Sequence, residues 1–205
     1  VYYLVNDAQL NVLVLRSYHF DNQKQPRSIG QNLKDVFFDD TILREPFRTI
    51  KVVASTPHFT LVPNKFFDAN NQAAYFQSLT QIAETDVCKN DFIRNANMNN
   101  VYLADNHILN VCYSVFPTAK IYHSLTPLIN GYQKISELRA GHQIFANIRD
   151  GALQICFFDG RELIFANNYV FKTAQDLIFY IMLVYEQFKL NPETTPLSIS
   201  GALTE

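Results

Sequence analysis

Hydrophobic and polar positions alternate most regularly in the last third of the chain, over residues 142–205. Three runs, HQIFANI, ALQICFF and RELIFANNYVF, are separated by the dipeptides Asp150-Gly151 and Asp159-Gly160. Asp-Gly tolerates the positive φ angles of tight hairpin turns. The three runs are therefore predicted to be antiparallel strands joined by hairpins.

The middle run is apolar on both of its faces. Leu153, Ile155 and Phe157 share one face, and Cys156 and Phe158 lie on the other. A strand with only one buried face would alternate between apolar and polar residues. This sheet is therefore expected to be covered on both sides.

An amphipathic helix follows the third run. Thr173 and Asp176 have the spacing of a capping box, in which the side chain of each residue accepts a hydrogen bond from the backbone N–H of the other. The apolar stripe that follows consists of Leu177, Ile181, Val184 and Phe188. Asn191-Pro192 is expected to end the helix, and residues 197–200 form a further predicted strand before Gly201.

The order of elements, three strands, a helix and a strand, is that of a ribonuclease-H-like half of an actin-type fold. The fold class predicted is therefore α/β with mixed sheets. Residues 1–140 are predicted to form a first such half with an inserted hairpin and helices, and residues 141–205 a second half. Because each half lacks one element at its outer end, both termini are expected to be incomplete.

The first half has weaker patterns. Strands are predicted at residues 1–5, 11–17, 49–55, 59–62, 101–104 and 120–123, and helices at 31–44, 70–83, 105–116 and 125–138. Ser124 is predicted to cap the last of these helices. Residues 85–100 are polar and rich in asparagine, which favours a loop.

Charge and cysteine content exclude several classes of function. The net charge is −2 with both signs interspersed, so no basic surface is expected to attract nucleic acid or a membrane surface. No apolar run has the length of a membrane span, so no direct insertion is expected. The cysteines, Cys88, Cys112 and Cys156, are far apart and form no C-x-x-C pair, which favours a cytoplasmic protein without disulfides.

The residues at the predicted phosphate turn lack most of the chemistry of an actin-like ATPase. Such enzymes hold phosphate with glycine-rich hairpin turns and position a divalent ion with carboxylates. The second-half motif reads approximately DIGGGTTD, whereas residues 147–154 read NIRDGALQ. Asn147 and Gln154 replace acids, and Arg149 replaces a glycine.

If nucleotide binding is retained, the candidate residues are Asp7, Arg149, Asp150, Gly151 and Gly201. The first-half turn at residues 6–9 has no glycine, and Gly201 stands alone where such folds carry two glycines at the adenosine. Ordinary hairpin roles are favoured for Arg149 and Asp150. The expectation is therefore no cofactor, with ATP and Mg²⁺ as the alternative.

Other catalytic chemistry has less support. A two-metal nuclease of this fold requires several acids, and residues 143–148 carry none. The five histidines have no H-x-x-x-H or H-E-x-x-H spacing for zinc. A pairing of Cys112 with His123 stays open, although a buried cysteine is the commoner outcome.

Several segments together resemble one protein family. They are SYHF (17–20), STPHFTLVPNKFF (55–67), NVYLAD (100–105), FPTAKIYHSLTPLI (116–129) and FANNYVFKTAQDLIFYIMLVYEQFKLNPETTPLSISG (165–201). Their order and spacing are similar to an uncharacterised bacterial domain-of-unknown-function family. The resemblance implies an actin-like ATPase fold over most of the chain but implies no activity.

Two functional hypotheses follow. The first is a non-catalytic binding or assembly module that docks an unidentified protein partner, with a homodimer formed through a sheet edge as a variant. The second is a nucleotide-dependent ATPase or kinase-like enzyme with non-standard phosphate-turn residues. A narrow or filled phosphate site and an exposed apolar patch would favour the first.

Overall fold

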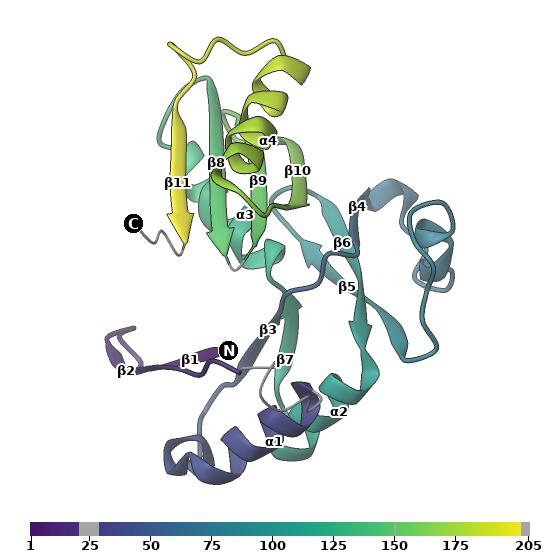
Figure 1. Cartoon of the computed structure of the whole chain (residues 1–205), viewed down its shortest axis with the longest axis vertical. Coiled ribbons are helices and arrows are strands. Elements are labelled where there is room, and N and C mark those ends of the chain that lie inside the picture. The colour runs from purple at the N-terminus through teal and green to yellow at the C-terminus, as the bar shows by residue number, and fades with distance from the viewer. Residues whose placement is uncertain (21–28, 150, 202–205) are drawn as a thin grey trace. The chain divides into compact units, whose positions relative to one another are not determined.

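The computed structural model describes residues 1–20, 29–149 and 151–201. The chain forms two compact units, labelled by their elements in Figure 1. The first unit comprises Val1–Arg48 and His107–Pro117, and the second comprises Thr49–Asn106 and Thr118–Glu205. The predicted division into halves at residue 140 stays a prediction.

The first unit contains a strand hairpin and helices. Its elements are β1 (Tyr2–Asn6), β2 (Val12–Ser17), α1 (Ile29–Asp39), the 3₁₀ helix η1 (Thr41–Arg44) and most of α2 (Asn106–Val115). β1 and β2 pair antiparallel, as predicted. The helix predicted over residues 31–44 is instead two helices, because Asp40 leaves the helical conformation and caps η1.

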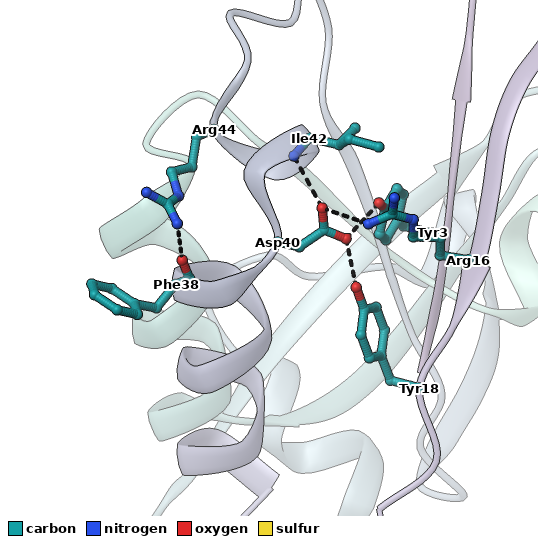
Figure 2. Close-up of polar contacts among 7 residues, drawn as sticks. All are labelled: Tyr3, Arg16, Tyr18, Phe38, Asp40, Ile42 and Arg44. Atoms are coloured by element: carbon teal, nitrogen blue, oxygen red, sulfur yellow. Dashed lines mark hydrogen bonds and ion pairs between the residues drawn. The ribbon is translucent and has the colours of Figure 1, made fainter.

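Asp40 connects the hairpin to the helical segment of the first unit (Figure 2). Its carboxylate accepts hydrogen bonds from the hydroxyls of Tyr3 (2.6 Å) and Tyr18 (2.5 Å) and from the N–H of Ile42 (3.0 Å), and it pairs with Arg16 at 3.0 Å. Burial alone would raise the pKa of Asp40, but these donors outweigh burial and lower the pKa to about 2. Asp40 is therefore a charged anchor within this unit.

The second unit contains three sheets. The strands are β3 (Lys51–Ala54), β4 (Phe59–Pro63), β5 (Asp86–Ile93), β6 (Met98–Asp105), β7 (Lys120–His123), β8 (His142–Arg149), β9 (Ala152–Asp159), β10 (Glu162–Val170) and β11 (Leu197–Gly201). The helices are η2 (Asn64–Phe66), η3 (Gln72–Phe76), α3 (Leu125–Ser136) and α4 (Ala174–Gln187). Among the described residues, the sheet orders are β10-β9-β8-β11, β4-β6-β5 and β3-β7.

The largest sheet is covered on both faces, as the sequence predicts. Ile155 of β9 packs in a cluster with Ile181 and Val184 of α4. On the opposite face Phe158 packs with Leu125 and Ile129 of α3. The final strand β11 pairs parallel to β8, so the chain crosses over through α4.

The start of α4 is confirmed in detail. Thr173 Oγ1 accepts the N–H of Asp176 at 3.1 Å, and the Asp176 carboxylate accepts the N–H of Thr173 at 3.0 Å. This reciprocal pair satisfies backbone donors that the first turn leaves open. Ser124 differs from its prediction, because its side chain makes no capping hydrogen bond to α3.

Two further predictions are wrong. Residues 70–83 form the short helix η3 and irregular turns instead of a long helix. The Tyr75 hydroxyl accepts the N–H of Asp68 and donates to the carbonyl of Phe66, and Leu79 is exposed. Residues 85–100 form most of two paired strands, β5 and β6, not a loop. Within these strands the side chain of Asn99 accepts a hydrogen bond from Asn90 at 3.1 Å and donates one to Asn64 at 3.0 Å.

A buried polar cluster joins the three-stranded sheet to the start of α3. His123 Nε2 donates to the carbonyl of Thr56 (2.9 Å), and Nδ1 accepts from the side-chain amide of Asn100 (3.0 Å). Asp91 accepts from the His123 N–H (2.8 Å) and from the Thr126 hydroxyl (2.7 Å). Both ring nitrogens of His123 are therefore used by the neutral form, and burial lowers its pKa to about 4.

The cysteines are unpaired. Cys112 and Cys156 are buried, and Cys88 is partly exposed. Burial raises the pKa of the Cys156 thiol well above its ordinary value. The ring of His123 is hydrogen-bonded to Asn100 and Thr56, and the pairing of Cys112 with His123 considered from the sequence stays a prediction.

We expect Gly201→Ala to destabilise the protein by about 1–3 kcal/mol. Gly201 has a φ of +107°, and a Cβ there would lie 2.0 Å from the carbonyl oxygen of Ile148. Gly131→Ala in α3 is the control, because its Cβ would meet nothing within 4 Å. Helix propensity predicts that the control gains roughly 0.5–1 kcal/mol. Urea unfolding of both variants measures the difference, and equal stabilities would contradict the argument.

We expect the free energy of unfolding to fall by roughly 3 kcal/mol as the pH drops from about 6.5 to about 4, through His123. The unfolded histidine binds a proton near pH 6.5, whereas the folded one resists protonation until about pH 4.

The measurement is the difference in unfolding free energy between wild type and His123→Gln as the pH changes. Asp91 titrates nearby with a pKa that burial raises. Since Asp91 is present in both proteins, subtraction removes most of its contribution. A difference that stays constant between pH 7 and pH 4 would refute the role of His123.

Candidate functional site

The candidate site is the end of the largest sheet where β8 turns into β9. Asn147 and Arg149 lie on the face of β8 that packs toward α3, together with Phe145. Gln154 lies opposite Asn147 on β9. The same end of the sheet contains Ser200 of β11, which is paired with Asn147.

A continuous chain of neutral hydrogen bonds runs through this end of the sheet. Ser200 Oγ donates to Asn147 Oδ1 at 3.2 Å, and Asn147 Nδ2 donates to Gln154 Oε1 at 3.3 Å. Gln154 Nε2 then donates to Ser124 Oγ at 2.9 Å. The hydroxyls of Tyr132 and Ser200 are hydrogen-bonded at 2.7 Å, with either oxygen able to donate, and this contact extends the chain to α3.

The centre of this chain is buried, its two serines are partly buried, and none of its side chains is charged. Asn147 and Gln154 are each only 4% exposed. Burial raises the pKa of Tyr132, against the hydrogen bond to Ser200, so this hydroxyl is also neutral at physiological pH. We name these five residues, Ser124, Tyr132, Asn147, Gln154 and Ser200, the amide chain.

The amide chain explains why Ser124 does not cap α3. Its hydroxyl accepts the proton of Gln154 and lies 3.4 Å from the hydroxyl of Ser55. The Ser124 hydroxyl oxygen is thus hydrogen-bonded to a side chain of the sheet and not to a backbone N–H in the first turn of α3. Sequence reasoning identified Asn147 and Gln154 as replaced acids but missed Tyr132 and Ser124, which are distant in sequence and carry no motif.

The structure places the predicted nucleotide-binding residues as follows. Arg149 ends β8 opposite Ala152, and Gly151 follows in the turn with a φ of +76°. Gly201 pairs with Ile148, beside the end of β8 that carries Arg149. Asp150 lies outside the described residues.

Asp7 belongs to the first unit, whereas Arg149, Gly151 and Gly201 belong to the second. Its carboxylate accepts hydrogen bonds from the backbone N–H groups of Gln9 (2.9 Å) and Asn11 (2.8 Å) and from the Asn11 side chain. These donors, the Asn11 side chain first, lower the pKa of Asp7. The carboxylate therefore stabilises its own turn between β1 and β2.

The part of the chain that the structure describes contains no cluster of metal-ligating side chains. No three His, Cys, Asp or Glu side chains come together there in a geometry that could hold an ion. In the amide chain the oxygens that face one another are amide and hydroxyl oxygens. Such oxygens can contact a ligand, but they supply no negative charge to a divalent cation.

A family model described as "Protein of unknown function (DUF3822)" matches residues 1–205. The chain belongs to this family. The match agrees with the resemblance found in the sequence, and no curated protein matches the chain significantly. Membership in the DUF3822 family assigns no activity.

Solved structures show the fold of this DUF3822 member. A protein of Bacteroides thetaiotaomicron, described as having an actin-like ATPase fold and unknown function, matches with a TM-score of 0.86 and 22% identity. The match covers 95% of this chain and 74% of that one. The fold is therefore α/β and actin-like, as predicted.

A more distant match is a "PilM-PilN type IV pilus biogenesis complex", with a TM-score of 0.44 and 11% identity. The alignment covers 88% of this chain and 60% of that one. Likeness at this level does not inform function. Within the described residues, no helix of this DUF3822 member is long and apolar enough to cross a membrane.

We expect Asn147→Asp to destabilise the fold by about 1–3 kcal/mol at pH 7, because it buries a carboxylate beside amide and hydroxyl groups. Burial raises the pKa of such a carboxyl group, so the loss should shrink as the pH falls and the group becomes neutral. Asn191→Asp is the control, since Asn191 is exposed and its Oδ1 accepts the N–H of Glu193. Urea unfolding at pH 7 and pH 4.5 measures both, and equal losses at the two sites would contradict the argument.

Proposed function

We propose that this protein is a non-catalytic actin-like module that binds a protein partner, and that its nucleotide site is degenerate. The amide chain is the observation that carries the proposal. Asn147 and Gln154 occupy the positions where an ATPase of this fold has acids, and they are hydrogen-bonded to each other. An amide pair cannot neutralise Mg²⁺ or orient its bound waters as carboxylates do.

The energetics of the site support the same conclusion. To contact a metal or phosphate, Asn147 or Gln154 would have to leave a buried hydrogen bond, which costs about 1–3 kcal/mol for the group left unpaired. In an ATPase the corresponding acids are held ready for the ion. In this protein Asn147 and Gln154 are hydrogen-bonded to each other instead.

A second observation supports docking of a protein. Helix α4 exposes Ile178 (60%), Phe179 (61%) and Met182 (45%) along one side. Met182 is four residues after Ile178 and three after Phe179, so it neighbours each of them on the helix surface. Contiguous apolar surface of this kind marks interaction sites on proteins, and a homodimer is a variant of the same proposal.

The proposal includes a cytoplasmic location. The three cysteines are unpaired, and Cys156 is enclosed in a core where no disulfide could form without unfolding. Proteins of oxidising compartments commonly use their cysteines in disulfides.

The alternative function is nucleotide binding with unusual ligands. It is favoured by Arg149 at the end of β8 and by the glycine that follows in the turn, where backbone N–H groups can approach phosphate. In this case the enzyme would rely on cationic and backbone contacts in place of the missing acids.

We expect ATP, ADP and GTP at millimolar concentration, with or without Mg²⁺, to leave the melting temperature unchanged. A nucleotide at 100 times its dissociation constant would stabilise the protein by about 2.7 kcal/mol, which a thermal-shift assay detects readily. An active ATPase of the same fold, measured in parallel, is the positive control.

A shift that depends on Mg²⁺ and disappears in Arg149→Ala would refute the degenerate site and support the enzyme. Asn191→Ala, an exposed change in the turn after α4, is the matched control for nonspecific effects on melting.

A further inference from the structure

An open cavity of about 370 Å³ lies between β4 and β10 in the second unit. This volume is within the range of about 300–1,000 Å³ that is typical of ligand sites. Its walls include the consecutive residues 59–61 of β4 and 163–167 of β10. The face of a strand contributes only every second residue, so runs of consecutive residues mean that the edges of both strands border the cavity.

Both strands are the outer members of their sheets. β4 begins the order β4-β6-β5, and β10 begins the order β10-β9-β8-β11. Figure 1 shows both strands in the upper part of the view. β4 continues the chain from β3, and β10 lies beside α4. Outer strands present backbone N–H and C=O groups that their own sheet does not pair.

The hydrogen-bond register of β4 identifies which groups face outward. The carbonyl of His58 accepts the N–H of Leu103, and the N–H of Asn64 donates to Asn97, so even-numbered residues point toward β6. Backbone groups alternate sides along an antiparallel strand. Phe59 and Leu61 therefore direct their N–H and C=O groups to the side away from β6, and both residues line the cavity.

The edge of β10 is less regular. Its pairing with β9 shifts between Leu163 and Phe165, which leaves Ile164 as the additional residue of a β-bulge. A bulge interrupts the even spacing of backbone groups that a further strand would need. Ile164, which is 41% exposed, is thus better placed to supply apolar contact than backbone pairing.

The chemistry of the lining restricts the ligand further. The described residues that border the cavity are uncharged, and they include the apolar side chains Leu79, Met98 and Ile164. Leu79 is 60% exposed. A charged ligand would lose its hydration here without gaining a counter-charge.

We propose that this groove binds an extended, uncharged segment of a partner protein, which pairs its backbone with the outer edge of β4 and places alternate apolar side chains against Leu79 and Ile164. The proposal rests on the function as a binding module and names its partner chemistry. Backbone pairing supplies affinity in this mode, and the pockets for alternate side chains supply selectivity.

The test begins with selection of random dodecapeptides displayed on phage against the full chain. The dominant peptide, synthesised with a fluorophore, is then the probe for fluorescence anisotropy. We expect selected peptides to have an uncharged centre with apolar residues at alternate positions. Failure to enrich any such peptide would overturn the proposal.

Two changes test the binding mode. Ile164→Lys should weaken binding of the probe at least tenfold, whereas Val170→Lys, on the same strand, outside the cavity lining and 63% exposed, should leave it unchanged. N-methylation of one alternating set of peptide amides should abolish binding, and methylation of the other set should have little effect. Equal effects of the two lysine variants, or of the two methylated sets, would overturn the proposal.

Sedimentation of wild type and Ile164→Lys tests the competing occupant. Self-association that is lost in this variant would assign the groove to a second copy of the chain and overturn the proposal. The proposed function fails separately, through nucleotide binding in the thermal-shift assay. If nucleotides are inert and the groove variants change nothing, the module stands and its partner surface lies elsewhere.

Discussion

The second unit depends on a sheet whose central strands are enclosed on both faces. α4 covers one face through Ile181 and Val184, and α3 covers the other through Leu125 and Ile129. Neither helix could bury its apolar stripe without the sheet, and the sheet would expose a full layer of aliphatic and aromatic side chains without either helix. A polar side chain within this arrangement loses its hydration and is stabilised by any partner that it finds there.

The amide chain is the consequence of that constraint. Asn147 and Gln154 are at positions where the fold can hold acids, but the space above them contains Ser124, Ser200 and Tyr132. Buried carboxylates need cations or multiple donors, whereas amides satisfy both an acceptor and a donor locally. The two neutral amides and the hydrogen-bond chain that they form are thus one structural solution.

Sequence patterns predicted the elements whose signals are local. The Asp-Gly turns, the two apolar faces of β9 and the Thr173–Asp176 capping box act over a few residues, and all but the turn residue Asp150 are described and confirmed. The helix predicted over residues 70–83 was wrong. Its apolar residues have helical spacing, but in the structure Phe76 is buried and Leu79 is exposed, so they do not form one buried face. Asparagines in β5 and β6 suggested a loop, since their partners on other segments cannot be seen in sequence.

The candidate site was predictable only in part for the same reason. Comparison with the phosphate motif identified Asn147 and Gln154 as neutral replacements, but their partners come from α3 and β11. The edge residues of the groove have no sequence signal at all. A strand edge is defined by what does not pair with it, and the bulge at Ile164 depends on the register with β9.

Cys156 provides the molecule with an internal reporter. Its thiol is fully buried in the layer between the sheet and α3, among Phe145, Phe158 and Leu125. An alkylating reagent can reach it only when α3 separates from the sheet, whereas partly exposed Cys88 stays accessible in the native state. The ratio of the two labelling rates therefore measures how often this layer opens, without any change to the sequence.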